Sequence, residues 1–95
     1  MADTLMSIQI IPKTPGGEDV IPYVDAAIAV IDASGLPYFV SPLETTIEGT
    51  MAELLPLIGQ MNRRMMELDC TSVISQVKFY HAADASMAEL VKNYR

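Results

Sequence analysis

The chain has 95 residues, of which 51% are hydrophobic and 19% charged, and its formal net charge is −6. This length and composition predict one folded domain over residues 1–95 and exclude a disordered chain. Because so short a chain cannot bury all its apolar side chains, and because negative charge repels phosphate backbones and anionic lipids, we expect self-association and no nucleic acid or membrane partner.

The first third of the chain predicts a strand followed by a helix. Residues 5–11 alternate between apolar and polar side chains, which is the period of a half-buried strand, and Pro12 is expected to end it. Apolar residues then follow helical spacing over 20–31, with Asp19 as the candidate cap and Gly35 in the stop signal.

The middle of the chain predicts a hairpin and a second helix. Aromatic and β-branched residues at 37–41 and 45–49 predict two short strands. Thr50 and Glu53 have the spacing of a capping box, and Pro56 is expected to kink the helix that they open, unless the first turn of that helix is not α-helical. The predicted buried stripe of this helix is Met51, Leu54, Leu55, Ile58, Met61, Met65 and Leu68.

Residues 71–80 alternate again and predict a fourth strand, expected at the centre of the sheet, and Ser86 with Glu89 predicts a short final helix. The order β-α-β-β-α-β predicts a ferredoxin-like α+β sandwich, with a four-stranded antiparallel sheet and both long helices on one face. The helix-covered face would hold Met6, Ile8, Ile10, Ile47, Val73, Val77 and Phe79. The open face would hold Ser7, Gln9, Thr46, Glu48, Gln76, Lys78 and Tyr80, mixed with Leu5, Ile11 and Ile74.

The sequence gives little support for catalysis or metal binding. Cys70 and His81 are the only residues of their kinds, and a metal site needs several convergent ligands. Ser7, His81 and Asp84 could form a triad only on paper, because no nucleophile motif positions them. Gly16 and the following glycine could hold an anion before a helix, but the pattern is weaker than a phosphate-binding loop. We expect neither catalytic residues nor a metal site.

A polar cluster on the predicted sheet is the better candidate for function. A carboxylate in a partly dry cavity can hold a protonated ring nitrogen or an exocyclic amine, and Tyr38 or Tyr80 could stack on a flat ring. Glu48 could equally cap a helix or lie at a rim. The candidate ligand-binding residues are Ser7, Gln9, Tyr38, Thr45, Thr46, Glu48 and Gln76.

Four phrases along the chain resemble one family. They are SIQIIP at 7–12, SGLPY at 34–38, TTIEG at 45–49 after Pro42, and KNYR at 92–95. In this order they resemble the thiamine-binding, YkoF-like family of small ferredoxin-like proteins. The resemblance implies a noncatalytic cytoplasmic protein that forms dimers or tetramers through its sheets. It also implies thiamine or its hydroxymethylpyrimidine moiety as ligand, with no further cofactor, and Glu48 or a neighbouring hydroxyl bonded to the aminopyrimidine edge.

Two other classes of function stay open at this point. The open face could serve a regulatory module that pairs only with protein, without a small ligand. The fold also hosts enzymes, although no convincing base and nucleophile pair is present. The longest aliphatic run, 26–31, is far too short to span a bilayer, so we expect a cytoplasmic protein.

Overall fold

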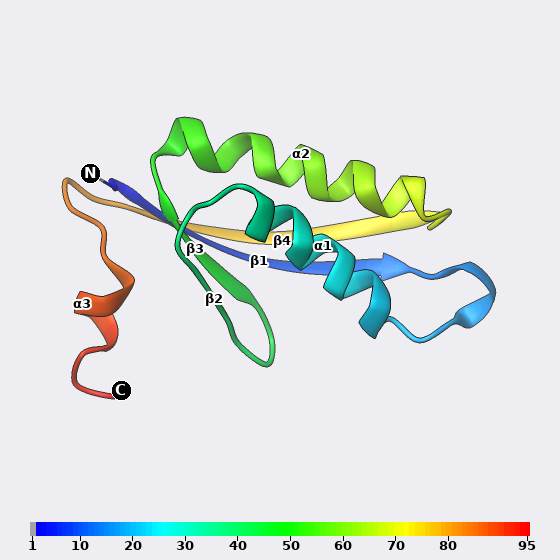
Figure 1. The fold of residues 1–95 in the computed structure, drawn as a ribbon, viewed down its shortest axis with the longest axis horizontal. Coiled ribbons are helices and arrows are strands. Elements are labelled where there is room, and N and C mark those ends of the chain that lie inside the picture. Colours follow the sequence, from blue (N-terminus) through cyan, green and yellow to red (C-terminus); the bar gives the residue numbers. More distant parts are fainter. Residues whose placement is uncertain (1) are drawn as a thin grey trace.

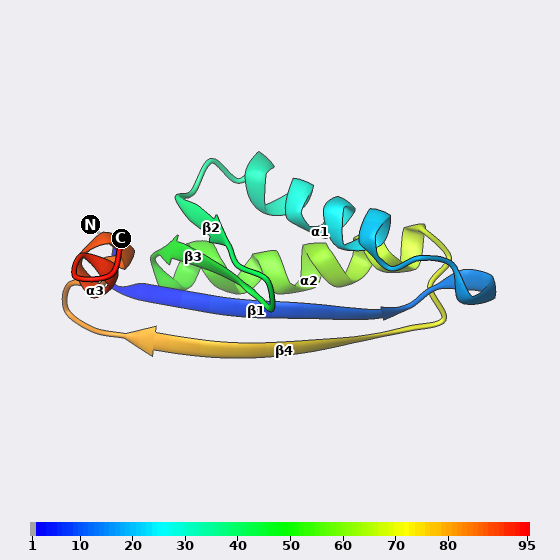
Figure 2. The ribbon, with the colours of Figure 1, turned by 90° about the horizontal axis from the view of Figure 1, so that it is seen from below.

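Two layers form the computed structural model, which describes residues 2–95 (Figure 1). The antiparallel sheet has the order β2-β3-β1-β4, and α1 and α2 cover one of its faces, as Figure 2 shows. This arrangement confirms the ferredoxin-like α+β fold. The strands are β1 (Thr4–Lys13), β2 (Tyr38–Val40), β3 (Thr45–Gly49) and β4 (Ser72–His81), and the α-helices are α1 (Ile21–Ala33), α2 (Met51–Glu67) and α3 (Met87–Val91).

Strand β1 continues through Pro12 to Lys13, so the prediction that the strand ends at this proline was wrong. β1 pairs with β4 along its whole length, whereas β3 pairs only with residues 4–8 of β1. The Ala82 N–H donates to the Asp3 carbonyl at 2.9 Å, so these two residues form a hydrogen-bonded pair between β1 and β4. Because hydrogen-bonded and non-hydrogen-bonded pairs alternate, Thr4 begins the series of β1 residues that exchange no hydrogen bond with β4. Pro12 falls in that series, and its nitrogen faces the side that β3 no longer occupies. The missing N–H therefore breaks no ladder bond.

Strand β4 is an edge of the sheet, and the prediction of a central position was wrong. Within residues 2–95 only β1 pairs with it, and β1 and β3 occupy the centre. The alternating pattern of β4 reports which face of the strand is buried, and it carries no information on strand order. Alternate N–H and C=O groups from Val73 to His81 therefore face outward without a partner strand in the described chain.

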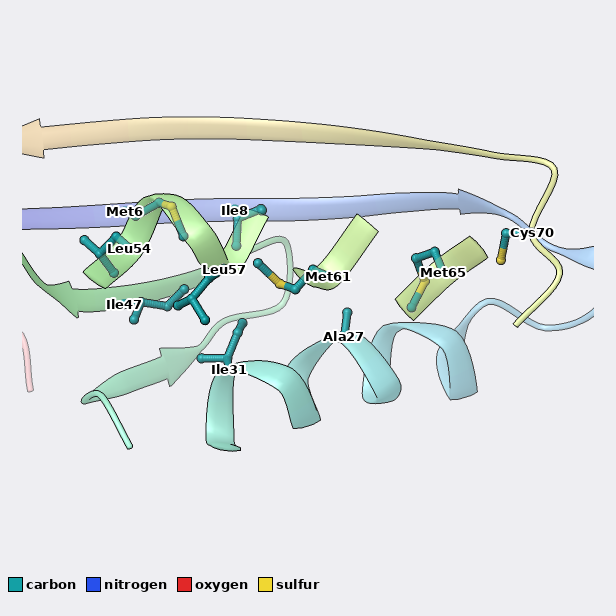
Figure 3. Packing of buried hydrophobic residues seen from close by; sticks show 10 residues of the cluster. All are labelled: Met6, Ile8, Ala27, Ile31, Ile47, Leu54, Leu57, Met61, Met65 and Cys70. Carbon is teal, nitrogen blue, oxygen red and sulfur yellow. The ribbon is translucent and has the colours of Figure 1, made fainter. Parts of the chain in front are cut away.

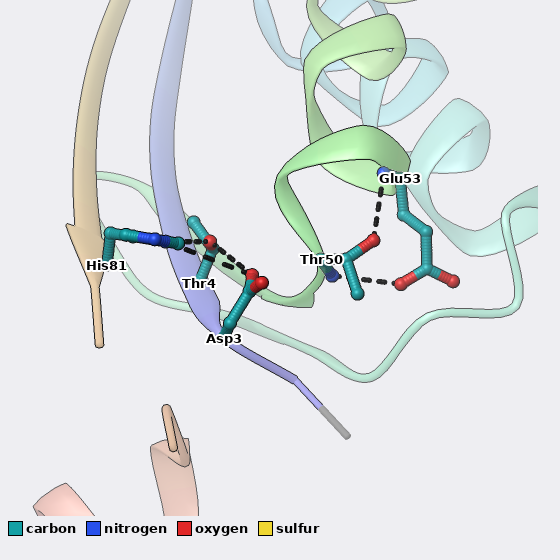
Figure 4. Close-up of polar contacts among 5 residues, drawn as sticks. All are labelled: Asp3, Thr4, Thr50, Glu53 and His81. Carbon is teal, nitrogen blue, oxygen red and sulfur yellow. Dashed lines mark hydrogen bonds and ion pairs between the residues drawn. The ribbon is translucent and has the colours of Figure 1, made fainter. Parts of the chain in front are cut away.

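The helix ends follow from local hydrogen bonds. Thr50 accepts from the Glu53 N–H at 3.2 Å and donates its own N–H to the Glu53 carboxylate at 2.9 Å, which confirms the capping box (Figure 4). Asp19 accepts from the Ile21 N–H at 3.1 Å at the start of α1. Gly35, at φ +77°, ends α1 in the left-handed conformation that glycine adopts most easily.

Helix α2 runs through Pro56 as one α-helix, so the expected kink does not divide it. Proline has no N–H to give the carbonyl four residues earlier, and the position is exposed. Pro56 thus removes a helical bond without interrupting the element.

Replacing Pro56 by alanine is expected to raise the free energy of unfolding by about 2 kcal/mol. Alanine restores the N–H and favours the helix interior by about 3 kcal/mol, while the freer unfolded chain offsets about 1 kcal/mol of that gain. Urea denaturation followed by circular dichroism measures the change. Gly59→Ala is the control, because Gly59 is an exposed site on the same helix where a Cβ meets nothing within 4 Å. We expect it to add only about 0.5–1 kcal/mol. A loss of stability in Pro56→Ala would contradict this account.

The core lies between the sheet and the two long helices. Figure 3 shows Met61 pointing from α2 into the space between the sheet and α1. On α2 the buried stripe uses Leu57, whereas the predicted Leu55 is 49% exposed. The cluster of buried residues is Met6, Ile8, Ala27, Ile31, Ile47, Leu54, Leu57, Met61, Met65 and Cys70.

Candidate functional site

The face of the sheet that α1 and α2 leave open carries most of the predicted polar residues. Strand register places Phe39, Thr46, Ser7 and Lys78 next to one another in a single row across β2, β3, β1 and β4. Paired side chains in an antiparallel sheet point to the same face, with Cβ atoms about 5 Å apart. We call these four residues the Thr46 row.

Gln9 and Gln76 are the next polar pair on the same face. They oppose each other in the pairing of β1 with β4, two residues along from Ser7 and Lys78. The structure thus brings Ser7, Gln9 and Gln76 together with Thr46, as the sequence pattern predicted. The face presents two hydroxyls and two amides within a few strand spacings.

An ion pair crosses the Thr46 row beside Ser7. The Glu44 carboxylate lies 3.4 Å from the Lys78 ammonium. The Ser7 hydroxyl is buried and meets no partner at hydrogen-bond geometry within residues 2–95. It still lies close enough to Glu44 that, with Lys78, it lowers the pKa of that carboxyl despite the opposing effect of desolvation. The resulting stabilisation is present above the unfolded pKa of Glu44 and is lost as pH falls through the lower folded value.

Glu48 lies on the open face and contacts α3. Its Oε1 accepts from the Met87 N–H at 2.8 Å, at the first residue of that helix. A carboxylate there satisfies a free backbone donor and favours the positive end of the helix dipole. The contact matches the alternative prediction that Glu48 caps a helix, but the capped helix is α3 and not α2, which follows Glu48 in the sequence.

A groove of about 510 Å³ lies between α3 and the hairpin of β2 and β3. Leu5, Phe39 and Thr46 form its sheet side, and Leu90 and Val91 belong to its α3 side. Its walls are mainly apolar, with hydroxyls at the margin. Ser7, Gln9, Thr46 and Gln76 together form what we call the polar patch of the open face. Since Thr46 belongs both to this patch and to the groove, the two are continuous.

The Arg95 guanidinium stacks on an aromatic ring at this groove. Its central carbon lies 4.0 Å from the centroid of the Phe39 ring. Phe39 was absent from the predicted site, and Tyr38 or Tyr80 was expected to stack on a flat ring. One face of the Phe39 ring thus already holds a planar cation, and both residues line the groove.

Tyr38 and Thr45 lie on the opposite face from the other predicted residues. Tyr38 pairs with Ile47 and donates its hydroxyl to Asp32 of α1 at 2.9 Å, and this bond and burial raise the pKa of Tyr38. Thr45 pairs with Ile8 and is 6% exposed. Consecutive residues of a strand alternate between faces, so neither can share the face of Thr46. Tyr38 still contributes atoms to the edge of the groove.

His81 lies with Thr4 and Asp3 (Figure 4). It pairs with Thr4, whose side chain points to the opposite face of β1 from that of Ser7. The Thr4 hydroxyl donates to Asp3 at 2.7 Å, so its 2.9 Å contact with His81 Nδ1 requires the imidazole to donate. The Thr4 bond, followed by the His81 charge, lowers the pKa of Asp3 against desolvation. Thr4 is fully buried, so its hydroxyl is inaccessible to a substrate.

Two other hollows lie on the helix side of the sheet. One, of about 660 Å³, runs between α1 and α2 past Arg63 and the exposed Arg64–Glu67 ion pair, and the other, of about 310 Å³, lies past the tip of the β2–β3 hairpin. Neither contains the Thr46 row. Over residues 2–95 no three potential ligands of the His, Cys, Asp and Glu types gather to hold a metal ion. In the same residues, every helix is too short or too polar to cross a bilayer.

Comparisons with known proteins relate the whole chain to one group. A family model described as "Thiamine-binding protein" matches residues 6–95. A UPF0045 protein of Clostridium perfringens is 33% identical over 91 residues, which are 95% of each chain. A Bacillus cereus domain of unknown function, DUF77, has a TM-score of 0.89 and 29% identity, covering 99% of this chain and 92% of that one. A Thermotoga maritima protein provisionally assigned to thiamine biosynthesis or salvage has a TM-score of 0.86 and 26% identity, covering 98% and 99%.

Proposed function

Because the chain belongs to the thiamine-binding protein family, we propose that it binds thiamine or its hydroxymethylpyrimidine moiety on the open face of its sheet, without catalysing a reaction. The observation that carries this proposal is the continuity of the groove with the polar patch through Thr46. A volume of about 510 Å³ lies in the range of small-molecule sites, which combine mainly apolar walls with a few polar groups. A ligand with one polar ring and one cationic ring could place the polar ring at the polar patch and the cationic ring in the groove.

The polar patch has the donors and acceptors that an aminopyrimidine needs. A hydroxyl can donate to a ring nitrogen and a carboxylate can accept from an exocyclic amine, and the second bond is the stronger because it is charge-assisted. Ser7 and Thr46 supply the hydroxyls, and Glu44 brings a carboxylate to the same place. We therefore assign the pyrimidine to this patch, with Gln9 and Gln76 at its border.

Isothermal titration calorimetry with thiamine and with hydroxymethylpyrimidine tests the proposal. We expect saturable heat from both ligands, and an increase in melting temperature at concentrations above Kd. Choline is the control ligand, since it is a cation without an aromatic ring and measures nonspecific attraction to the acidic chain. Absence of heat and of thermal stabilisation at millimolar thiamine and pyrimidine would refute this function.

We also propose that two copies associate through β4. Its outer edge is a ten-residue row with unpaired backbone groups, and such an edge readily pairs with another strand. Exposed apolar side chains lie along it, including Ile74 at 63% and Phe79 at 42%. The edge is also what a protein-interaction module without a small ligand would use, so the ligand titration separates the two functions.

The Ile74→Glu variant is expected to sediment as a monomer of 10.4 kDa, whereas the unmodified chain sediments at a multiple of that mass. A carboxylate in place of this apolar side chain loses solvation when a second β4 strand covers it. Analytical ultracentrifugation at micromolar concentration measures the masses. Leu43→Glu makes the same change at a residue that is 77% exposed at the hairpin tip, and it should leave the mass unchanged. A monomeric unmodified chain, or equal masses in all three proteins, would show that β4 does not pair in this way.

A further inference from the structure

We infer that the face of Phe39 is a stacking site for a planar organic cation of the thiazolium type, and that the chain's own Arg95 occupies it when no ligand is bound. The inference rests on the proposed function and deepens it, because it assigns the cationic ring of the ligand to one side chain. It also makes Arg95 a competitor of that ring.

The first argument is the geometry of the contact. Arg95 places its guanidinium carbon 4.0 Å above the centroid of the Phe39 ring, within the distance at which a cation is attracted to an aromatic face. A guanidinium and a thiazolium are both flat ions with delocalised positive charge. The position that accepts the first can therefore accept the second. Phe39 is 45% exposed and forms part of the groove wall, so its ring is accessible from the groove.

The second argument is the charge beside the ring. Thr46 and Glu48 fall on one face of β3, and Glu44 lies two residues before Thr46, immediately ahead of the strand, so the two carboxylates flank the residue that pairs with Phe39. Each lies about 7 Å along the strand from Thr46. Lys78 neutralises Glu44 at 3.4 Å, and Arg95 supplies the second positive charge nearby. A bound cation would take over the electrostatic role of Arg95.

The third argument is that Arg95 is weakly held. Among the described residues its side chain forms no ion pair, and its backbone N–H reaches only the Val91 carbonyl, at 3.1 Å. The adjacent Tyr94 is 83% exposed, so little packing fixes this segment. An exposed cation–π contact is weak enough for a ligand to displace.

Calorimetry on Arg95→Ala tests the competition. We expect thiamine to bind about two- to five-fold more tightly than to the unmodified chain, because the competing contact is gone. Hydroxymethylpyrimidine should bind equally to both proteins, since it lacks the cationic ring. The matched control is Lys92→Ala, which removes one positive charge from the exposed Lys92–Glu89 pair of the same segment. It should leave thiamine affinity unchanged, and Phe39→Leu should weaken thiamine but not the pyrimidine.

Equal gains in Arg95→Ala and Lys92→Ala would mean that general charge acts, and would overturn the inference. Unchanged thiamine affinity in Phe39→Leu or in Arg95→Ala would overturn it as well.

If neither ligand binds the unmodified chain, the proposed function fails, and a fluorescence experiment decides the inference separately. The chain has no tryptophan, so Phe39→Trp introduces a single reporter at the ring. The 3-methylthiazolium ion should quench it saturably, and at lower concentration when Arg95→Ala is added. Quenching without saturation, or without dependence on Arg95, would overturn the stacking site.

Discussion

The Thr46→Tyr variant is expected to lose thiamine binding by at least about 100-fold, which corresponds to roughly 2.7 kcal/mol. Thr46 lies at the junction of the groove and the polar patch, so a phenol ring there occupies the space of both ligand rings. The fold should tolerate the change, since tyrosine favours strands and the new ring would lie opposite Phe39 in a favourable aromatic pair. Calorimetry measures the affinity, and urea denaturation checks the stability.

Val40→Tyr is the matched control for this variant. Val40 lies on the same hairpin and is 48% exposed, but it pairs with Thr45 and therefore faces the opposite side of the sheet. It should bind thiamine like the unmodified chain. Retained binding in Thr46→Tyr together with an intact fold would move the ligand away from the open face.

Met61→Ala is expected to lower the free energy of unfolding by about 2–5 kcal/mol. Met61 is fully buried and belongs to the core cluster between the sheet and the two long helices. The change therefore removes apolar burial and leaves a cavity. Chemical denaturation gives the difference from the midpoint and slope.

Met66→Ala makes the same substitution on the same helix at a residue that is 45% exposed. We expect it to change the free energy of unfolding by no more than about 0.5 kcal/mol. Similar losses in the two variants would mean that α2 presents a different face to the core.

The fold could be predicted from sequence because each element leaves a local pattern. The two-residue period over 5–11 and 71–80 identifies β1 and β4, and the spacing of Thr50 and Glu53 locates the start of α2. Strand order depends on pairings between distant segments and leaves no such pattern. This is why the edge position of β4 was missed, and why the continuation of β1 through Pro12 appears only once the short reach of β3 is known.

The candidate site could be predicted only in part, for a related reason. Alternation correctly grouped Ser7, Gln9 and Gln76, and it also shows that Thr45 and Thr46 cannot share a face. The contact of Arg95 with Phe39 joins residues far apart in the sequence, and no short motif predicts it. The same holds for the bond from Met87 to Glu48, because it joins residues 39 positions apart in the sequence.

Over residues 2–95 the sheet has three stretches of free edge, and they differ in their capacity to recruit further chains. β2 offers only three residues, and the part of β1 beyond β3 contains Pro12, which has no N–H to donate. β4 alone offers a long uninterrupted row of donors and acceptors. Pairing of two β4 strands about a twofold axis would satisfy the free backbone groups of β4 in both molecules. The edges that remain exposed, at β2 and at the end of β1, are poorly suited to pair with a further strand. Growth by edge addition would then stop at a closed pair, and this would protect the apolar chain from forming fibrils.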